Sequence, residues 1–283
     1  MYKLIQLIKL FIPPIIFILF KRKIFKKQDI QFIKTNLSWD EAYIQTSKGY
    51  SSNNIIKKCR DSLLKVKNGE YPYERDSVLF DDLQIFYPLL SSLFYISLLN
   101  MKKLNIIDYG GSLGSTYYQN KNILRDAGIA INWNIIEQEN FVICGKEIFE
   151  NNELHFYNNI CEVLEANNNI SVYLLSSFLP YIREPYKILD EIKSKDIEYL
   201  IIDRTVFLQN ETKDILTIQN VPSAIYSVSY PAWFLSLDAF LLYINEYYDI
   251  IYKWQALDQN YLKNYNTIGL GFLLKKKKNV AIN

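Results

Sequence analysis

The chain has 283 residues, of which 49% are hydrophobic and 15% aromatic, and its formal net charge is +2. The apolar content is sufficient for a sizeable core, and the length predicts one domain with an N-terminal addition rather than two full domains. The near-balanced charge, with no dense basic stripe in the middle of the chain, argues against nucleic acid as a partner. The cysteines, Cys59, Cys144 and Cys161, form no CxxC pair, which predicts a reducing, cytosolic compartment.

Residues 1–27 form a basic and strongly apolar arm without a single acid. Its apolar run, residues 4–20, is shorter than the roughly 20 residues of a spanning helix and is broken by Pro13 and Pro14. No small-residue cleavage site follows, so a signal peptide is not expected. We predict an arm over residues 1–30 that lies peripherally on the inner face of the membrane, where its lysines meet anionic headgroups. The alternative is a helix packed on the protein's own body or on a partner.

Residues 31–100 are predicted to be a helical extension that includes a lid. Helices are expected within residues 39–69 and 83–99, and Pro88 either kinks the second helix or moves its start later. The stretch between them, residues 69–82, is typical of an ordered loop. It is either a linker held by local ion pairs or a lid over the site that follows. Its polar residues include Tyr73, Glu74, Arg75 and Asp76.

The stretch LNIIDYGGSLGSTYY, residues 104–118, predicts a ligand site. A short apolar run of the kind that forms a buried strand ends on Asp108, and Gly110, Gly111 and Gly114 follow before a helix begins. Glycines allow the backbone to approach a ligand closely, and a helix N-terminus presents free N–H groups. These are the parts of a site that holds a nucleotide-like molecule.

Strand and helix patterns alternate after this turn. Further strands are expected at residues 133–138, 154–157, 170–177 and 196–205, and intervening helices predict right-handed crossovers and a parallel sheet. Ligands bind at the carboxyl ends of the strands in such a sheet. The candidate binding residues lie at these ends: Asp108, Glu137, Asn158, Ser176, Ser177 and Asp203.

The last part of the chain breaks the alternation. A helix is expected within residues 229–245, and two strands, 248–254 and 267–277, follow without a helix between them. Such strands should pair antiparallel. We therefore predict an α/β, Rossmann-like domain over residues 101–283, with a mainly parallel seven-stranded sheet closed by an antiparallel pair.

The glycine turn does not match the best-known phosphate loops. A dinucleotide fingerprint requires G-x-G-x-x-G, and registers that start at Gly110 or Gly111 place serine, leucine or threonine at the other glycine positions. A Walker loop requires Gly-Lys before serine or threonine, which is absent nearby. The pattern that fits is acid-x-Gly-x-x-x-Gly, formed by Asp108, Gly110 and Gly114. Glu137 ends the next strand, where its carboxylate can accept two ribose hydroxyls.

This arrangement resembles the class I S-adenosylmethionine-dependent methyltransferases. Their first motif is acid-x-Gly-x-Gly-x-Gly, whereas here Ser112 replaces the middle glycine and Gly111 is extra. From about Phe11 onward the chain also resembles a bacterial family of methyltransferases associated with surface-polysaccharide gene clusters. The blocks that carry this second resemblance are KVKNGEYPYERDSVLFD, IIDYGGSLGSTYYQN, WNIIEQENFVICGK, LLSSFLPYI, IIDRTVF and IYSVSYPAWF.

The resemblance implies roles for the strand-end residues. The three glycines would line the methionine moiety, Asp108 would hold its amino group directly or through water, and Glu137 would bind the ribose. Asn158 or Asn159 would contact adenine, and Ser176 and Ser177 would face the methyl group. For the glycines, the alternative is a tight turn that binds no ligand. For Glu137, the alternative is a solvent-exposed residue at the end of a strand.

The chemistry of methyl transfer requires little beyond aligning the acceptor with the methyl group, although a hydroxyl acceptor benefits from a base. Asp203, with Arg204 beside it, is the candidate base. The alternative for Asp203 is an acid held by Arg204 or a helix cap. His155 lies at the start of a strand, away from its carboxyl end. The sequence contains no metal-binding pattern, so S-adenosylmethionine is the only cofactor expected.

These observations predict metal-independent O-methylation of a sugar or lipid-linked surface glycan. The acceptor class follows from the family resemblance and from the arm. Two alternatives remain. The first is an NAD-dependent sugar-modifying enzyme, which the absence of the dinucleotide-binding glycine pattern argues against. The second is a non-catalytic scaffold in a membrane-associated glycan-assembly complex. Such a protein would have the Rossmann-like fold but no methyltransferase activity.

Overall fold

The computed structural model describes residues 30–46, 53–167, 169–195, 197–222 and 228–278. The basic arm predicted at residues 1–27 lies outside these ranges, so its contact with a membrane stays a prediction. Within the described ranges, no helix has the length and apolar character needed to cross a membrane.

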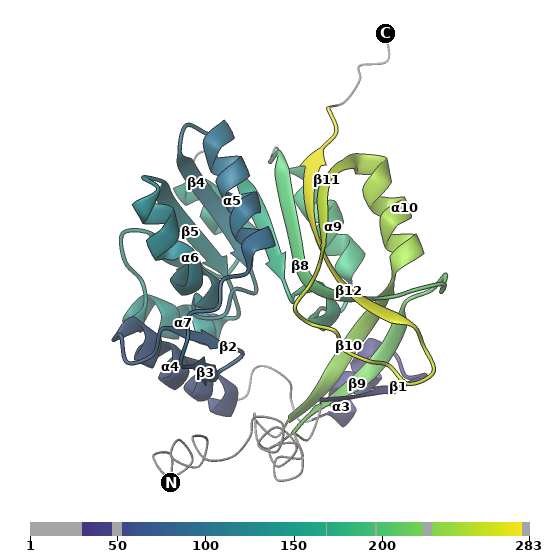
Figure 1. Cartoon of the computed structure of the whole chain (residues 1–283). Helices are drawn as coiled ribbons and strands as arrows, with labels where there is room; N and C mark the ends of the chain where they lie inside the picture. The colour runs from purple at the N-terminus through teal and green to yellow at the C-terminus, as the bar shows by residue number, and fades with distance from the viewer. Residues whose placement is uncertain (1–29, 47–52, 168, 196, 223–227, 279–283) are drawn as a thin grey trace, which may run out of the picture. The chain divides into compact units, whose positions relative to one another are not determined.

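Seven strands form the α/β sheet that the sequence predicts. Their order is β6–β5–β4–β7–β8–β12–β11, and neighbours run parallel except at β12, which is antiparallel to β8 and β11 (Figure 1). The mainly parallel, Rossmann-like sheet and its closing antiparallel pair are therefore confirmed. The strands are β4 (Lys103–Tyr109), β5 (Ala130–Ile136), β6 (Leu154–Tyr157), β7 (Val172–Ser176), β8 (Tyr199–Leu208), β11 (Tyr248–Gln255) and β12 (Thr267–Lys276).

The central strands are continuous apolar runs because both faces of the sheet are covered. Alternate residues enter different cores: Ile106 and Leu174 pack in one, Ile107 and Tyr173 in the other. We call the face that carries Ile106 and Leu174 the α5 face. It is covered by α4 (Asn53–Lys67), α5 (Tyr87–Leu99), α6 (Ser115–Asp126) and α7 (Glu139–Ile148), and the opposite face by α8 (Ile160–Ala166), α9 (Pro185–Ser194) and α10 (Leu237–Tyr247).

Three further strands, β1 (Gln31–Lys34), β9 (Ile215–Val221) and β10 (Val228–Ser236), extend the sheet (Figure 1). β10 runs parallel to the carboxyl end of β8, β9 is antiparallel to β10, and β1 is antiparallel to β9. The sequence did not predict these strands. β1 has four mostly exposed residues, so its strand conformation depends on pairing with β9 rather than on a local apolar pattern. The helix expected within residues 229–245 is α10, which begins only where β10 ends.

The N-terminal extension contains helices, as predicted, and a hairpin. The helical stretch expected within residues 39–69 contains α3 (Trp39–Gln45) and α4, and α5 begins at Tyr87 with Pro88 in its first turn. The expected loop, residues 69–82, contains the hairpin of β2 (Tyr73–Arg75) and β3 (Val78–Phe80). Its two turn residues, Asp76 and Ser77, both have positive φ, as a tight two-residue hairpin turn requires. β2 packs against α4 and α6, which brings this segment to the glycine turn.

Candidate functional site

The predicted polar strand ends lie on one face of the sheet. Asp108 and Asp203 each follow, by two residues, an isoleucine of the core on the α5 face, and side chains two residues apart in a strand share a face. Glu137 follows Ile135 in the same way, one residue beyond β5. Ser176 lies opposite Asp203 in the parallel pair of β7 and β8. The sheet therefore brings these four residues together at its carboxyl edge, on the α5 face.

The glycine turn requires glycine at two positions for steric reasons. Gly110 has φ +71°, and a Cβ atom there would collide with the ring of Phe178, just beyond β7. A Cβ atom on Gly111 would lie 2.6 Å from Oδ2 of Asp108. The backbone of the turn is thus packed directly between Asp108 and Phe178, and any side chain would push it out of place.

Asp108 packs against the glycine turn from the interior of the protein. Its side chain is 1% exposed and accepts a hydrogen bond of 2.9 Å from Nε1 of Trp133, in the neighbouring strand. Burial raises the pKa of Asp108 to about 7, and the bond from Trp133 opposes that rise. This carboxyl therefore ionises at a higher pH than an exposed aspartate.

Glu137 holds the turn from the side. Its Oε1 accepts from the N–H of Ser112 at 3.2 Å, and its Oε2 accepts from the N–H of Gln138 at 2.9 Å. Burial raises the pKa of the half-buried Glu137 to about 7. Ser112, which stands where the related motif has glycine, adopts φ +54°. This left-handed conformation costs a serine roughly 1–2 kcal/mol, and the bond to Glu137 helps to offset it.

Glu74 reaches the same turn from the hairpin. It is 3% exposed and accepts from the hydroxyl of Ser115, the first residue of α6, and from the N–H of Ser77 at 2.9 Å. Burial raises the pKa of Glu74 to about 7. The sequence placed Glu74 in a segment with two open interpretations and did not number it among the cofactor-binding candidates. The signal that could have found it was the acid between Tyr73 and Arg75, in a loop with a predicted lid role.

Asp203 and Arg204 lie at an irregularity in β8. The pairing with β12 shifts register between Leu270 and Phe272, so both residues oppose Gly271, and Arg204 adopts φ +51°. Such a bulge redirects a side chain. Asp203 is 1% exposed and accepts from Nε1 of Trp254 at 2.9 Å, and burial raises its pKa to about 6.

Arg204 lowers the pKa of Asp203 by its charge and by a backbone hydrogen bond, and its guanidinium bridges two other acids. Its side chain bonds to Asp76 of the hairpin at 2.6 Å and to Asp258 of the β11–β12 loop at 2.6 Å. The sequence suggested local ion pairs within the hairpin segment; the ion pair observed joins Asp76 to a residue far along the chain and fastens the segment to β8.

The two candidate adenine contacts differ in their surroundings. Asn159 caps α8, because its side chain accepts from the N–H of Glu162 at 3.1 Å. Asn158 is exposed, one residue beyond β6, and its N–H donates to the Glu162 carboxylate at 3.1 Å. The cap occupies Asn159, which leaves Asn158 as the better candidate.

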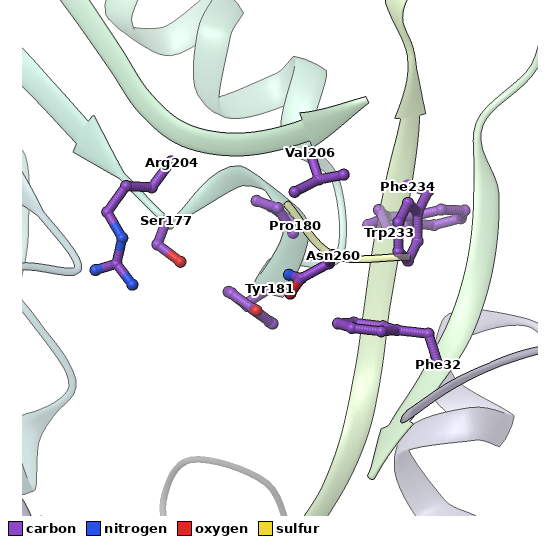
Figure 2. A pocket seen from close by; sticks show the side chains of 9 residues that line it. All are labelled: Phe32, Ser177, Pro180, Tyr181, Arg204, Val206, Trp233, Phe234 and Asn260. Carbon is purple, nitrogen blue, oxygen red and sulfur yellow. The ribbon is translucent and has the colours of Figure 1, made fainter. Parts of the chain in front are cut away.

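A pocket opens beside Ser177 and Arg204 (Figure 2). Its walls come from the turn after β7, from the 3₁₀ helix Leu179–Tyr181 and from the unpredicted strands β1 and β10. The lining mixes aromatic and polar side chains: Phe32, Ser177, Pro180, Tyr181, Arg204, Val206, Trp233, Phe234 and Asn260. The sequence identified Ser177 and Arg204 but not the rest, of which Phe32, Trp233 and Phe234 reach the pocket only because β1 and β10 pair with β9.

The residues that the structure describes contain no group of three His, Cys, Asp or Glu side chains arranged to hold a metal ion. The strand-end acids Asp108 and Asp203 each bond to a tryptophan.

Comparison with known proteins gives distant structural likenesses. No family model and no curated protein matches the chain. Magnesium protoporphyrin IX methyltransferase from Synechocystis PCC 6803, solved with S-adenosylmethionine, is 12% identical over 80% of this chain and 99% of that chain, with a TM-score of 0.42. A Methanosarcina mazei protein described as S-adenosylmethionine-dependent methyltransferase is 12% identical over 62% and 93%, with a TM-score of 0.41.

A third solved structure is the N-terminal domain of EvdMO1 in the presence of S-adenosylhomocysteine and D-fucose. It is 11% identical over 77% of this chain and 96% of that chain, with a TM-score of 0.43. Likeness at this level does not transfer an activity or a ligand. Any assignment of function to this chain has to come from its own residues.

Proposed function

We propose that the chain is an S-adenosylmethionine-dependent methyltransferase. The observation that carries the proposal is a set of three carboxyls around the glycine turn: Asp108 from below, Glu137 from the side and Glu74 from the hairpin. Among the described residues, none of the three forms an ion pair with a basic side chain. A buried acid without a cation is unfavourable, so the site favours a ligand that brings positive charge.

S-adenosylmethionine matches this charge, because it carries a cationic sulfonium and an ammonium group. A dinucleotide would instead bring a pyrophosphate with negative charge toward the same acids, which is unfavourable at short range. The residues present therefore fit S-adenosylmethionine better than NAD.

Each predicted residue takes a role consistent with its place. Glu137 would accept the ribose hydroxyls with the oxygen lone pairs that Ser112 and Gln138 leave free, and Asn158 would contact adenine. Ser176 and Ser177 would lie on the methyl side. The cofactor supplies the methyl group on its sulfonium, and the protein aligns the acceptor with it.

Asp203 is the proposed base. With a pKa of about 6 it is mostly ionised at neutral pH, and it lies level with Ser176 at the strand ends. A carboxylate in this position could take the proton of an acceptor hydroxyl as the methyl group transfers. Arg204 would act on the position of the neighbouring segments through its bonds to Asp76 and Asp258.

The acceptor is proposed to bind on the surface around the cavity of Figure 2, because the cavity itself, at about 10 Å³, is too small to enclose a sugar ring. Aromatic rings such as Trp233 offer an apolar face to a sugar ring, while Ser177 and Asn260 offer hydrogen-bonding groups to its hydroxyls. This lining supports a neutral, hydroxyl-bearing acceptor. The acceptor class we propose is a lipid-linked surface glycan, which the enzyme would reach at the membrane through residues 1–27. The methyl transfer would need no metal.

Calorimetric titration with S-adenosylmethionine, S-adenosylhomocysteine and NAD tests the cofactor. We expect the first two to bind and NAD to give no heat. Glu137→Gln should weaken the binding of S-adenosylmethionine and S-adenosylhomocysteine by about tenfold or more, because a hydrogen bond to a charged acceptor is lost. Glu153→Gln, which removes a half-buried carboxylate at the opposite end of the strands, should leave both unchanged. Binding of NAD alone would overturn the proposal, and binding of none would favour a scaffold.

Mass spectrometry of the surface glycan tests the acceptor. Cells that lack the gene should lose one methyl group from a glycan sugar, and an Asp203→Asn variant should fail to restore it. A glycan of unchanged mass in the deletion strain would contradict the acceptor class while leaving the cofactor untouched.

A further inference from the structure

We propose that Glu74, on the N-terminal hairpin, binds the cofactor by accepting a hydrogen bond from the α-amino group of its methionine moiety. The inference rests on the proposed function and adds to it a residue from outside the Rossmann-like domain. It means that the cofactor site is completed by the N-terminal extension.

The position of Glu74 supports this role. Its carboxyl contacts Ser115, which directly follows Gly114 and opens α6. The glycines of this turn are the residues proposed to line the methionine moiety. Glu74 therefore lies over the end of the turn at which the amino acid part of the cofactor is expected.

The bonding of Glu74 leaves room for an ammonium group. A carboxylate offers about four acceptor positions. The structure fills two of them, one from Ser115 and one from the N–H of Ser77. Both donors are neutral, and no basic side chain among the described residues forms an ion pair with Glu74, so the charge of the carboxylate has no direct counter-charge. An ammonium donor would balance it with a charge-assisted bond.

Arg204, the basic side chain that bonds to the hairpin, is paired with two acids other than Glu74. Arg204 bonds to Asp76 and Asp258, at 2.6 Å each. It forms no direct ion pair with Glu74, although its charge lowers the pKa of Glu74 while the charge of Asp76 raises it. The same ion pair to Asp76 fastens the hairpin two residues from Glu74 and holds the carboxyl over the turn.

Asp108 is less suited to direct contact with the amino group. It is 1% exposed, bonds to the indole of Trp133 and packs against Gly111 from below. The backbone of the turn thus lies over it. Asp108 thus fixes the turn, while Glu74 approaches from the hairpin side.

The test compares three ligands, of which one lacks the α-amino group. S-adenosylmethionine and S-adenosylhomocysteine carry this group, whereas 5′-methylthioadenosine does not. Calorimetry on the full chain and on Glu74→Gln should show both amino-bearing ligands weakened by about tenfold or more. Binding of 5′-methylthioadenosine should change by less than about twofold. The glutamine of this variant keeps an acceptor for Ser77 or Ser115, so the hairpin should persist.

Two control variants separate charge from structure. Glu153→Gln removes a carboxylate bonded to Tyr117 and Arg125 and should not affect any of the three ligands. Ser115→Ala removes one bond to Glu74 but keeps the charge, so the preference for amino-bearing ligands should remain. Thermal melting of each variant shows whether it folds.

The outcomes distinguish this inference from the proposed function. If the wild-type protein binds none of the three ligands, the proposed function fails. If it binds them and Glu74→Gln binds them equally well, the inference alone fails. Equal weakening of all three ligands in Glu74→Gln would also overturn it, because that pattern means a structural role for Glu74.

Discussion

Two buried aspartates near the carboxyl edge of the parallel strands each accept a hydrogen bond from a tryptophan; the sequence predicted that Asp203 ends its strand, but β8 continues to Leu208. Trp133 bonds to Asp108 and Trp254 bonds to Asp203, both at 2.9 Å. In each case burial raises the pKa of the acid and the indole N–H opposes the rise. At Asp108 the indole opposes the rise without adding a positive charge, whereas at Asp203 the charge of Arg204 opposes it as well.

Replacing Trp254 with phenylalanine should shift the pH dependence of methyl transfer. The variant loses the hydrogen bond that lowers the pKa of Asp203, so the pKa rises further above its present value of about 6. Asp203 then becomes ionised only at higher pH, and the acid side of the kcat profile moves to higher pH by roughly one unit.

The matched control for this measurement is Trp133→Phe. It removes the equivalent bond from Asp108, which lies under the glycine turn, so it should weaken cofactor binding and leave the acid side of the kcat profile in place. An identical profile for Trp254→Phe and the wild-type protein would contradict Asp203 as the base.

At the scale of elements, the β2–β3 hairpin joins the N-terminal extension to the site. β2 packs against α4 and α6, Glu74 contacts the start of α6, and Asp76 bonds to Arg204 of β8. The sequence left open whether this segment was a linker or a lid. The contacts place it at the glycine turn and hold it with a long-range ion pair, and a lid role stays a prediction.

Asp76→Asn should loosen the hairpin without unfolding the protein. The Asp76 side chain is 54% exposed, and exposed ion pairs contribute about 1 kcal/mol or less, so the melting temperature should change little. The affinity for S-adenosylmethionine should fall severalfold, with faster dissociation in stopped-flow measurements, because Glu74 is held less firmly.

Asp258→Asn is the control for the hairpin, since it breaks the other bond of Arg204 and leaves Asp76 paired. Its dissociation rate should remain near that of the wild-type protein. If both variants accelerate dissociation equally, Arg204 acts on the site through β8 and not through the hairpin.

At the scale of the whole molecule, the three carboxyls around the glycine turn make stability depend on pH. Burial raises the pKa of Glu74, Asp108 and Glu137 to about 7, well above the values of about 4 for exposed carboxyls. Between these values the folded protein binds more protons than the unfolded chain. Their contribution to the free energy of unfolding therefore decreases as pH rises from about 4 to about 7.

Melting temperatures of the wild-type protein and Glu74→Gln, measured between about pH 4 and pH 8, isolate one of these contributions. Glutamine does not ionise, so the variant should gain stability relative to the wild-type protein as pH rises toward about 7. Saturating S-adenosylmethionine should reduce the difference, because its positive charge compensates the wild-type carboxylate. A difference that is independent of pH would contradict an uncompensated buried Glu74.

Local pattern was sufficient for the seven central strands and for the glycine turn. Strands such as β6 and β7 follow apolar runs bounded by polar residues, and the carboxyl ends of parallel strands meet at one edge. The positions of Asp108, Glu137 and Asp203 at that edge followed directly. The assignment of these residues to a cofactor and a reaction stays a prediction.

The additional strands and the side-chain partners could not be predicted from local pattern. β1 pairs with β9, far along the chain, and Trp254 reaches Asp203 from two strands away. The bulge in β8 that redirects Arg204 depends on its pairing with β12. Such contacts depend on which distant segments pair in the folded protein. The sequence around each residue does not indicate which distant segment it will contact.

The sequence by itself therefore determined the α/β sheet, the turn after β4 and the acids at the strand ends, because periodicity and turn chemistry are local properties. Only the tertiary structure decided that a hairpin from the N-terminal extension places Glu74 over that turn, and that β1 and β10 build a pocket beside Ser177. Those arrangements arise from pairing and packing between segments far apart in the chain, where burial and charge balance are set by the neighbours each side chain acquires on folding.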